Sequence, residues 1–258
     1  MKTIQGRIGR LLFALGFIAL GVESLLLGTP VMRLEYWPKT YPDPALLGTI
    51  SGALVLIGGV ALLVPRFAQW GARLLALIAL VWVIMLHLPH LLPTLTHGDY
   101  WSGTAETFAV FGAAWVLMAL VPSGAFDRIA ALGIPYGRIC FGLSLLVFGA
   151  MHFIYHDFTA SFIPAWIPFR PFLAIATGAA HFAAGLAILS GILGRLAATL
   201  AGVMYGSWVL IPHIPRALLH VPPDAAANPP FEWNGVFVAT ILCGGALAVA
   251  ESFARRKA

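Results

Sequence analysis

Charged side chains are the scarcest feature of this sequence. They make up 10% of its 258 residues, against about 25% in soluble domains, while apolar side chains reach 60%. The mean hydropathy of +0.91 agrees with this balance. Such a composition excludes a cytosolic enzyme, a secreted disulfide scaffold and a free nucleic-acid binder. It predicts a chain that lies in a lipid bilayer.

Cysteines and nucleotide-binding motifs are also scarce or missing. The two cysteines, Cys140 and Cys243, form no Cys-x-x-Cys pair, which argues against a self-contained thiol–disulfide relay. The sequence contains no Walker loop and no dinucleotide-binding glycine fingerprint. Any chemistry must therefore come from other side chains.

Long apolar runs are what the sequence has in abundance. A backbone in hydrocarbon must satisfy its own hydrogen bonds, and about 20 helical residues cross the bilayer core. We therefore predict an all-α membrane bundle with eight transmembrane helices. They lie near residues 8–27, 45–64, 72–90, 104–121, 137–156, 172–190, 195–212 and 233–251.

The basic residues gather on one side of these spans, which predicts the orientation. Eleven lysines and arginines lie on the side that holds both termini and four on the other, so the termini are predicted to be cytoplasmic. This placement at the ends of apolar segments also explains the net charge of +5 without nucleic acid. The eleven are Lys2, Arg7, Arg10, Arg66, Arg73, Arg128, Arg138, Arg195, Arg255, Arg256 and Lys257, and the four are Arg33, Lys39, Arg170 and Arg216.

An internal duplication is visible when the chain is shifted by 126 residues. Trp82, His87, Pro89 and Glu106 then fall on Trp208, His213, Pro215 and Glu232, and at a shift of 128 Gly21 falls on Gly149. We predict two tandem four-helix repeats, residues 1–127 and 128–258. Because four crossings return the chain to its starting side, the repeats have parallel topology and a pseudo-twofold axis along the membrane normal. Small residues at helical spacing, including Gly52, Gly59, Gly178 and Gly185, suit close helix packing.

The second repeat resembles DoxX-like membrane proteins. The resemblance is carried by His152-Phe153, by Pro164 to Pro168, by Gly178 to His181 and by Gly194-Arg195-Leu196, and it continues through His213 and Phe231 to Asn234. It implies a bacterial inner-membrane protein, sometimes linked to quinone or thiol redox chemistry. The chain departs from the family in its duplication and in His181, where many members are expected to carry Glu.

Titratable side chains concentrate towards the outer side, and three of them are predicted as catalytic: His181, His213 and Glu232. His181 lies deep in the sixth span, where the first repeat has Val55. It is either functional or a neutral imidazole that bonds a neighbouring helix. His213 and Glu232 are nineteen residues apart, as are His87 and Glu106, and each pair forms either a proton relay or a structural clasp.

Two ligand sets follow from the neighbouring residues. Trp166, His152 and Trp208 are candidates for a cofactor, with quinone favoured over haem, although outer aromatics also form interface belts and Trp208 also suits a packing anchor. His152 and His156 are four residues apart on one predicted helix face and, with His181, are candidates for a divalent metal.

A membrane redox component is the leading functional prediction from the sequence. The bilayer and a redox partner protein are the expected partners, and whether the chain is an enzyme stays open. The alternatives are a metal-handling protein, a protein that stabilises a partner, and a small transporter, although no discontinuous helix with a midplane break is evident.

Overall fold

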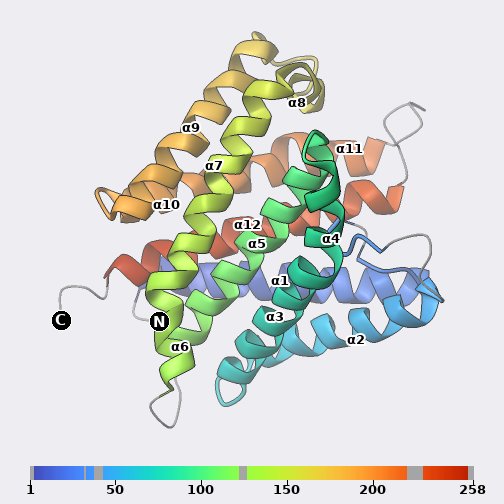
Figure 1. Ribbon diagram of the computed structural model, residues 1–258, viewed down its shortest axis with the longest axis vertical. Helices are drawn as coiled ribbons and strands as arrows, with labels where there is room; N and C mark the ends of the chain where they lie inside the picture. Colours follow the sequence, from blue (N-terminus) through green and yellow to red (C-terminus); the bar gives the residue numbers. More distant parts are fainter. Residues whose placement is uncertain (1–2, 32, 38–42, 122–126, 220–228, 255–258) are drawn as a thin grey trace.

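The computed structural model describes residues 3–31, 33–37, 43–121, 127–219 and 229–254. It is 86% helical, and its described residues contain no strand. Eight helices are long and apolar enough to cross a membrane, so the predicted all-α polytopic bundle is confirmed (Figure 1). Five of the counted basic residues (Lys2, Lys39, Arg255, Arg256 and Lys257) lie outside the described residues.

The helices of the first half follow the predicted spans closely. Its four long elements are α1 (Ile4–Leu27), α2 (Pro44–Leu63), α3 (Ala68–Trp82) and α5 (Gly98–Leu120). A π-helical turn, η1 (Val83–His87), continues α3 and leads into the short segments α4 (Leu88–Leu91) and η2 (Leu92–Thr94).

The second half repeats this order. A short helix and a π-helical turn, α6 (Arg128–Leu132) and η3 (Gly133–Gly137), lead into α7 (Arg138–Ile154), and α8 (His156–Phe162) follows it. Then come α9 (Arg170–Ser190), α10 (Gly194–Trp208), η4 (Val209–His213), α11 (Ile214–Leu219) and α12 (Pro229–Ala254).

Local sequence signals set several of the helix ends. The Thr3 side chain accepts a hydrogen bond from the Gly6 amide at the start of α1, and Asp43 does the same for Leu46 at the start of α2. α1 ends at Gly28, whose φ of 61° lies in the left-handed region that glycine adopts without strain.

The two π-helical turns η1 and η4 occupy equivalent places in the two halves. Each begins directly after the tryptophan of the repeat, Trp82 or Trp208, and ends on its histidine, His87 or His213. Proline follows at Pro89 in one and lies within the other at Pro212, so the wider turn accommodates a residue that cannot donate an amide hydrogen bond. These matched bounds support the predicted duplication.

The two halves interlock. Within each half the helices pack in chain order, α1 on α2 on α3 on α5, and α7 on α9 on α10 on α12. Between the halves, α1 lies along α12, α7 lies along α5, and α5 touches α12 (Figure 1). The first helix of each half thus packs on the last helix of the other, as a pseudo-twofold relation requires. The boundary at residue 127/128 stays a prediction.

Glycines allow the closest helix contacts, as their spacing predicts. A Cβ on Gly52 would lie 2.8 Å from Cβ of Ser24, and one on Gly21 would lie 2.7 Å from the Gly52 carbonyl oxygen. The equivalent contact in the second half joins Gly149 and Gly178, where a Cβ on Gly149 would lie 2.9 Å from the Gly178 oxygen. Small residues bring both helix pairs to backbone contact.

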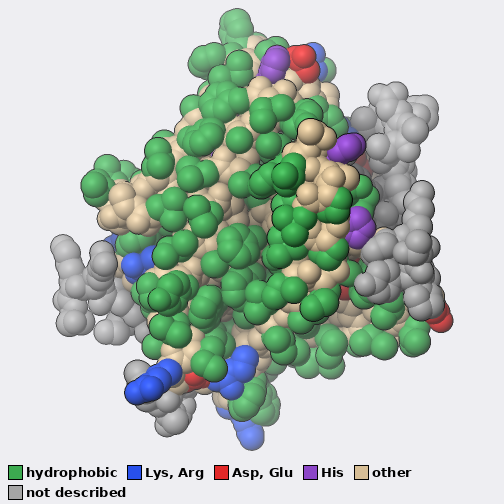
Figure 2. Space-filling model, in the orientation of Figure 1, with side chains coloured by type: hydrophobic (Ala, Val, Ile, Leu, Met, Phe, Trp, Pro, Cys, Tyr) green, Lys and Arg blue, Asp and Glu red, His purple; other side chains and the backbone are tan. Residues whose placement is uncertain are grey.

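Basic side chains and histidines gather at opposite ends of the bundle. Figure 2 shows hydrophobic side chains over most of the visible face, most of the visible lysines and arginines at its lower and left edges, and histidines towards the top and right. The basic end is also the end at which both termini lie (Figure 1).

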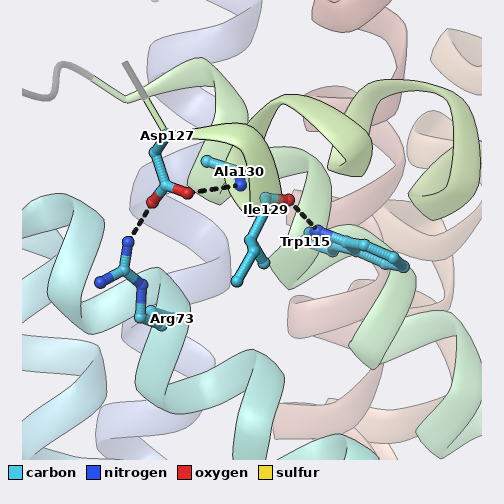
Figure 3. Close-up of polar contacts among 5 residues, drawn as sticks. All are labelled: Arg73, Trp115, Asp127, Ile129 and Ala130. Atoms are coloured by element: carbon cyan, nitrogen blue, oxygen red, sulfur yellow. Dashed lines mark hydrogen bonds and ion pairs between the residues drawn. The ribbon is translucent and has the colours of Figure 1, made fainter. Parts of the chain in front are cut away.

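A polar clasp at the basic end joins the segment between the halves to α3. Asp127 accepts the Ala130 amide at the start of α6 and pairs with Arg73, while the Trp115 indole donates to the Ile129 carbonyl over 2.7 Å (Figure 3). The Ala130 amide and then the Arg73 guanidinium hold the pKa of Asp127 below its usual value.

Candidate functional site

A cavity of about 580 Å³ opens among the helices of the second half, towards the histidine-rich end. Its walls come from α7, α8, α9, α10, η4 and α12, and α5 of the first half adds a further wall. Aromatic side chains supply most of its flat surfaces, namely Phe148, Phe158, Phe162 and Trp208. The polar groups that converge on it include Arg33, Glu106, His152, Thr177, Tyr205 and His213.

His152 presents a hydrogen-bond acceptor at this cavity. Its Nδ1 lies 2.8 Å from the Phe148 carbonyl oxygen, which can only accept, so in the neutral ring Nδ1 carries the proton. Nε2 is then the unprotonated nitrogen. The ring stacks on Trp208, with centroids 5.7 Å apart and planes inclined by 19°. His152 and Trp208 thus lie in contact at the cavity, and their predicted role as cofactor contacts stays a prediction.

His181 lies behind the cavity wall and does not line it. The side chain is fully buried, its Nδ1 lies 2.9 Å from the Thr177 carbonyl, and its Nε2 lies 3.2 Å from the Tyr205 hydroxyl. With the proton on Nδ1, Tyr205 donates to Nε2. The His152 ring is only 4.8 Å away, centroid to centroid. His181 can therefore act on the cavity through Tyr205 and His152, which do line it.

His213 faces the cavity, whereas its counterpart His87 serves the fold. His87 Nε2 lies 2.9 Å from both the Leu34 carbonyl and the Thr107 hydroxyl, and its side chain is buried. His213 is partly exposed, and its buried Nδ1 has no hydrogen-bond partner among the described residues. Gly235 permits this placement, because a Cβ there would lie 2.9 Å from His213 Nδ1.

The predicted histidine–carboxylate pairs are replaced by arginine–carboxylate pairs. Glu232 accepts two hydrogen bonds from Arg216, at 2.8 and 3.1 Å, and Glu106 lies 3.7 Å from Arg33. A guanidinium is always charged and matches a carboxylate with two donors, so it outcompetes a neutral imidazole. Glu232 is therefore paired with Arg216 and does not line the cavity, whereas Glu106 does line it.

The three histidines predicted as metal ligands do not form a cluster. The described residues contain no group of three or more His, Cys, Asp or Glu side chains placed to hold a metal ion. α7 ends at Ile154 and α8 begins at His156, so the helix face expected to carry both His152 and His156 is interrupted. His156 Nε2 instead lies 3.2 Å from Asp157.

Trp166 also lies apart from the predicted site. It is 76% exposed on the loop between α8 and α9, whereas its neighbours Pro164 and Ile167 line the cavity. Its position suits the interfacial belt that the sequence also allowed.

Three cavity residues escaped the sequence analysis as site residues: Arg33, Tyr205 and Thr177. Arg33 carried a usable signal, because it is one of only four basic residues on the side where cations are rare. Thr177 lies one helical turn before His181 on α9, beside the Gly178–His181 motif, whereas only the packing of α9 on α10 brings Tyr205 to His181.

Comparison with known proteins gives one match, in the second half of the chain. Residues 133–213 match the family model DoxX, so this part of the chain is similar to DoxX membrane proteins. The matched stretch is about a third of the chain and contains His152, His181, Trp208 and His213. Searches of curated proteins and of solved structures found no significant match.

Proposed function

We propose that this protein is a quinone-binding component of a membrane redox system, with its site in the second half near the extracytoplasmic face. The observation that carries the proposal is the cavity itself. Its 580 Å³ lies within the range of about 300–1,000 Å³ usual for small-molecule sites, and it combines apolar aromatic walls with a few convergent polar groups.

The chemistry of the lining suits a flat ring that carries oxygen atoms. His152 Nε2 can accept the proton of a quinol hydroxyl, and His213 Nδ1 provides a second nitrogen with no partner among the described residues. Oxidation of a quinol releases two protons and two electrons. The imidazoles would take the protons, and a redox partner protein at the outer surface would take the electrons.

The proposed location of the protein in the cell is argued from the distribution of its lysines and arginines. The basic residues at the end that holds both termini support a cytoplasmic position for the termini in a bacterial inner membrane. The cavity, which lies towards the opposite end, would then open near the extracytoplasmic leaflet.

Binding of decyl-ubiquinone to the purified protein in nanodiscs tests the proposal. We expect saturable quenching of tryptophan fluorescence, quinone in an organic extract of the purified sample, and weaker binding by His152→Leu. His156→Leu is the matched control, because His156 lies on α8 outside the cavity lining. A sample that holds no quinone and shows no saturable binding would refute the proposal, and its optical spectrum would show whether haem is bound instead.

A further inference from the structure

The cavity of the second half has a filled counterpart in the first half. The loop after α1 folds into the bundle there, with Val31, Leu34 and Glu35 each at most 3% exposed. We call Val31 and residues 33–37 the plug loop. The corresponding connection of the second half forms α8, whose residues Phe158, Thr159 and Phe162 border the cavity without filling it.

The Glu35 carboxyl occupies the polar end of the filled site. It accepts hydrogen bonds from the Val31 amide at 2.7 Å and from the Ser51 hydroxyl, and the Trp82 and Trp37 side chains are its further polar neighbours. Ser51 lies on α2 and Trp82 ends α3, so the carboxyl joins the loop to both helices. In the first half, the space between α2 and α3 is therefore occupied by an oxygen acceptor that lies next to a hydroxyl and an indole ring.

The equivalent positions of the second half carry the same two types of donor, a hydroxyl and an indole N–H. At the shift of 126, Ser51 corresponds to Thr177 and Trp82 to Trp208, and both of these line the cavity. Ser51 and Trp82 are buried, whereas Thr177 and Trp208 are partly exposed. The Thr177 hydroxyl lies 2.9 and 3.0 Å from the Leu173 and Ala174 carbonyls of its own helix, and such a hydroxyl can rotate towards a ligand oxygen.

We propose that the second-half cavity holds a quinone by one ring carbonyl, bound where the Glu35 carboxyl lies in the first half, with Trp208 Nε1 and Thr177 Oγ1 as the donors. This inference rests on the proposed function and assigns the oxygen contacts of the ligand. The plug loop is then an internal mimic of that ligand. His152, stacked on Trp208, stands beside the same oxygen and can take its proton when the oxygen belongs to a quinol.

Two variants in the second half and their two counterparts in the first half test this assignment. Trp208→Phe and Thr177→Val each remove one donor and keep most of the side-chain shape. We expect each to raise the Kd for decyl-ubiquinone roughly three- to tenfold, as the loss of one hydrogen bond does. Trp82→Phe and Ser51→Ala remove the same donors from Glu35, so they should lower the thermal stability and leave the Kd unchanged.

The carbonyl band of bound, ¹³C-labelled quinone gives an independent measurement. We expect Thr177→Val and Trp208→Phe to move this band to higher frequency, because a carbonyl that loses a donor becomes stiffer. Should the wild-type protein bind no quinone, the proposed function itself fails. Should it bind quinone while both variants keep the wild-type Kd and carbonyl band, the assignment of Trp208 and Thr177 is overturned and quinone binding stands.

Discussion

The two halves of the molecule have a similar arrangement of helices and differ in what occupies the space between those helices. In both, a tryptophan and a histidine bracket a π-helical turn, and paired glycines bring the first two helices together. In the first half the space beside the tryptophan holds Glu35, and in the second half it is a cavity. The two halves thus differ in whether the connection after the first helix fills the space between the helices or leaves a cavity there.

Buried polar groups follow the same division. His87 and Glu35 are hydrogen-bonded within the first half and tie its plug loop to the helices. Val55 lies where the second half has His181, whose hydrogen bond orients Tyr205 at the cavity. Similar residues therefore serve the fold in one half and stand at a cavity in the other.

The largest effect is expected from an exchange at the Val55/His181 pair. Val55→His places an imidazole in a fully buried apolar position, so it should lower the free energy of unfolding by about 3 kcal/mol through crowding and unpaired nitrogens. His181→Val should lower it by about 1–3 kcal/mol, because the Tyr205 hydroxyl loses its partner. Denaturant unfolding in detergent measures both.

A double variant tests the explanation given for His181→Val. Tyr205→Phe in the His181→Val background removes the hydroxyl that the single change leaves unpaired. We expect part of the lost stability to return. Strictly additive losses would show that the hydrogen bond between Tyr205 and His181 contributes little.

The plug loop should make stability depend on pH. Burial raises the pKa of Glu35 from 4.5 to about 7. The folded state then binds the proton more tightly than the unfolded state, so stability is highest below pH 4.5 and falls as the pH rises towards 7, by up to about 3 kcal/mol. Melting curves at several pH values measure this fall. Glu35→Gln should flatten it, and an unchanged slope in that variant would assign the pH dependence to another group.

Gly235 marks a smaller difference between the halves, since Ala109 stands at the equivalent position. A Cβ on Gly235 would lie 2.8 Å from Arg33 Nη1 and 2.9 Å from His213 Nδ1. Gly235→Ala should therefore displace both side chains and raise the Kd for quinone roughly tenfold, which corresponds to about 1.4 kcal/mol of binding free energy. Ala109→Gly is the control, with a small loss of stability and no change of Kd. Equal Kd values for Gly235→Ala and wild type would contradict the placement of the ligand next to α12.

The smallest effect is expected at the clasp between the halves (Figure 3). Asp127→Asn weakens the pairing with Arg73 at a partly exposed position near the surface, where ion pairs contribute little. Because the pKa of Asp127 is lowered in the folded state, its contribution is present at neutral pH and is lost in acid. Melting temperatures should differ slightly at pH 7 and coincide in acid, with an unchanged Kd for quinone. A large loss at pH 7 would show that the clasp holds the halves together.

The membrane architecture was predictable because its signals are local. A run of about 20 apolar residues fixes a spanning helix wherever it stands in the chain, and all eight such runs became helices. His152 and Trp208, which the sequence analysis assigned to one ligand, stack on each other, and their role as ligand contacts stays a prediction. The metal set was wrong because a turn at Tyr155, invisible in the spacing, separates His156 from His152.

The polar pairs were harder to predict, because a side chain reaches partners that sequence separation does not reveal. Glu232 was assigned to His213, yet Arg216, three residues further along, binds it with two donors. Glu106 was assigned to His87, yet Arg33 comes to it from the loop after α1. In both cases the longer and permanently charged side chain is the partner.

Hydropathy by itself determined the eight helices that are long and apolar enough to cross a bilayer, and the residues that match at a shift of 126 predicted an internal duplication. What only the tertiary structure decided is which half keeps an open cavity, because the way a connecting loop folds back onto the helices cannot be read from its sequence. That choice depends on the packing of Val31, Leu34 and Glu35 against α2 and α3, a set of contacts that exists only in the folded molecule.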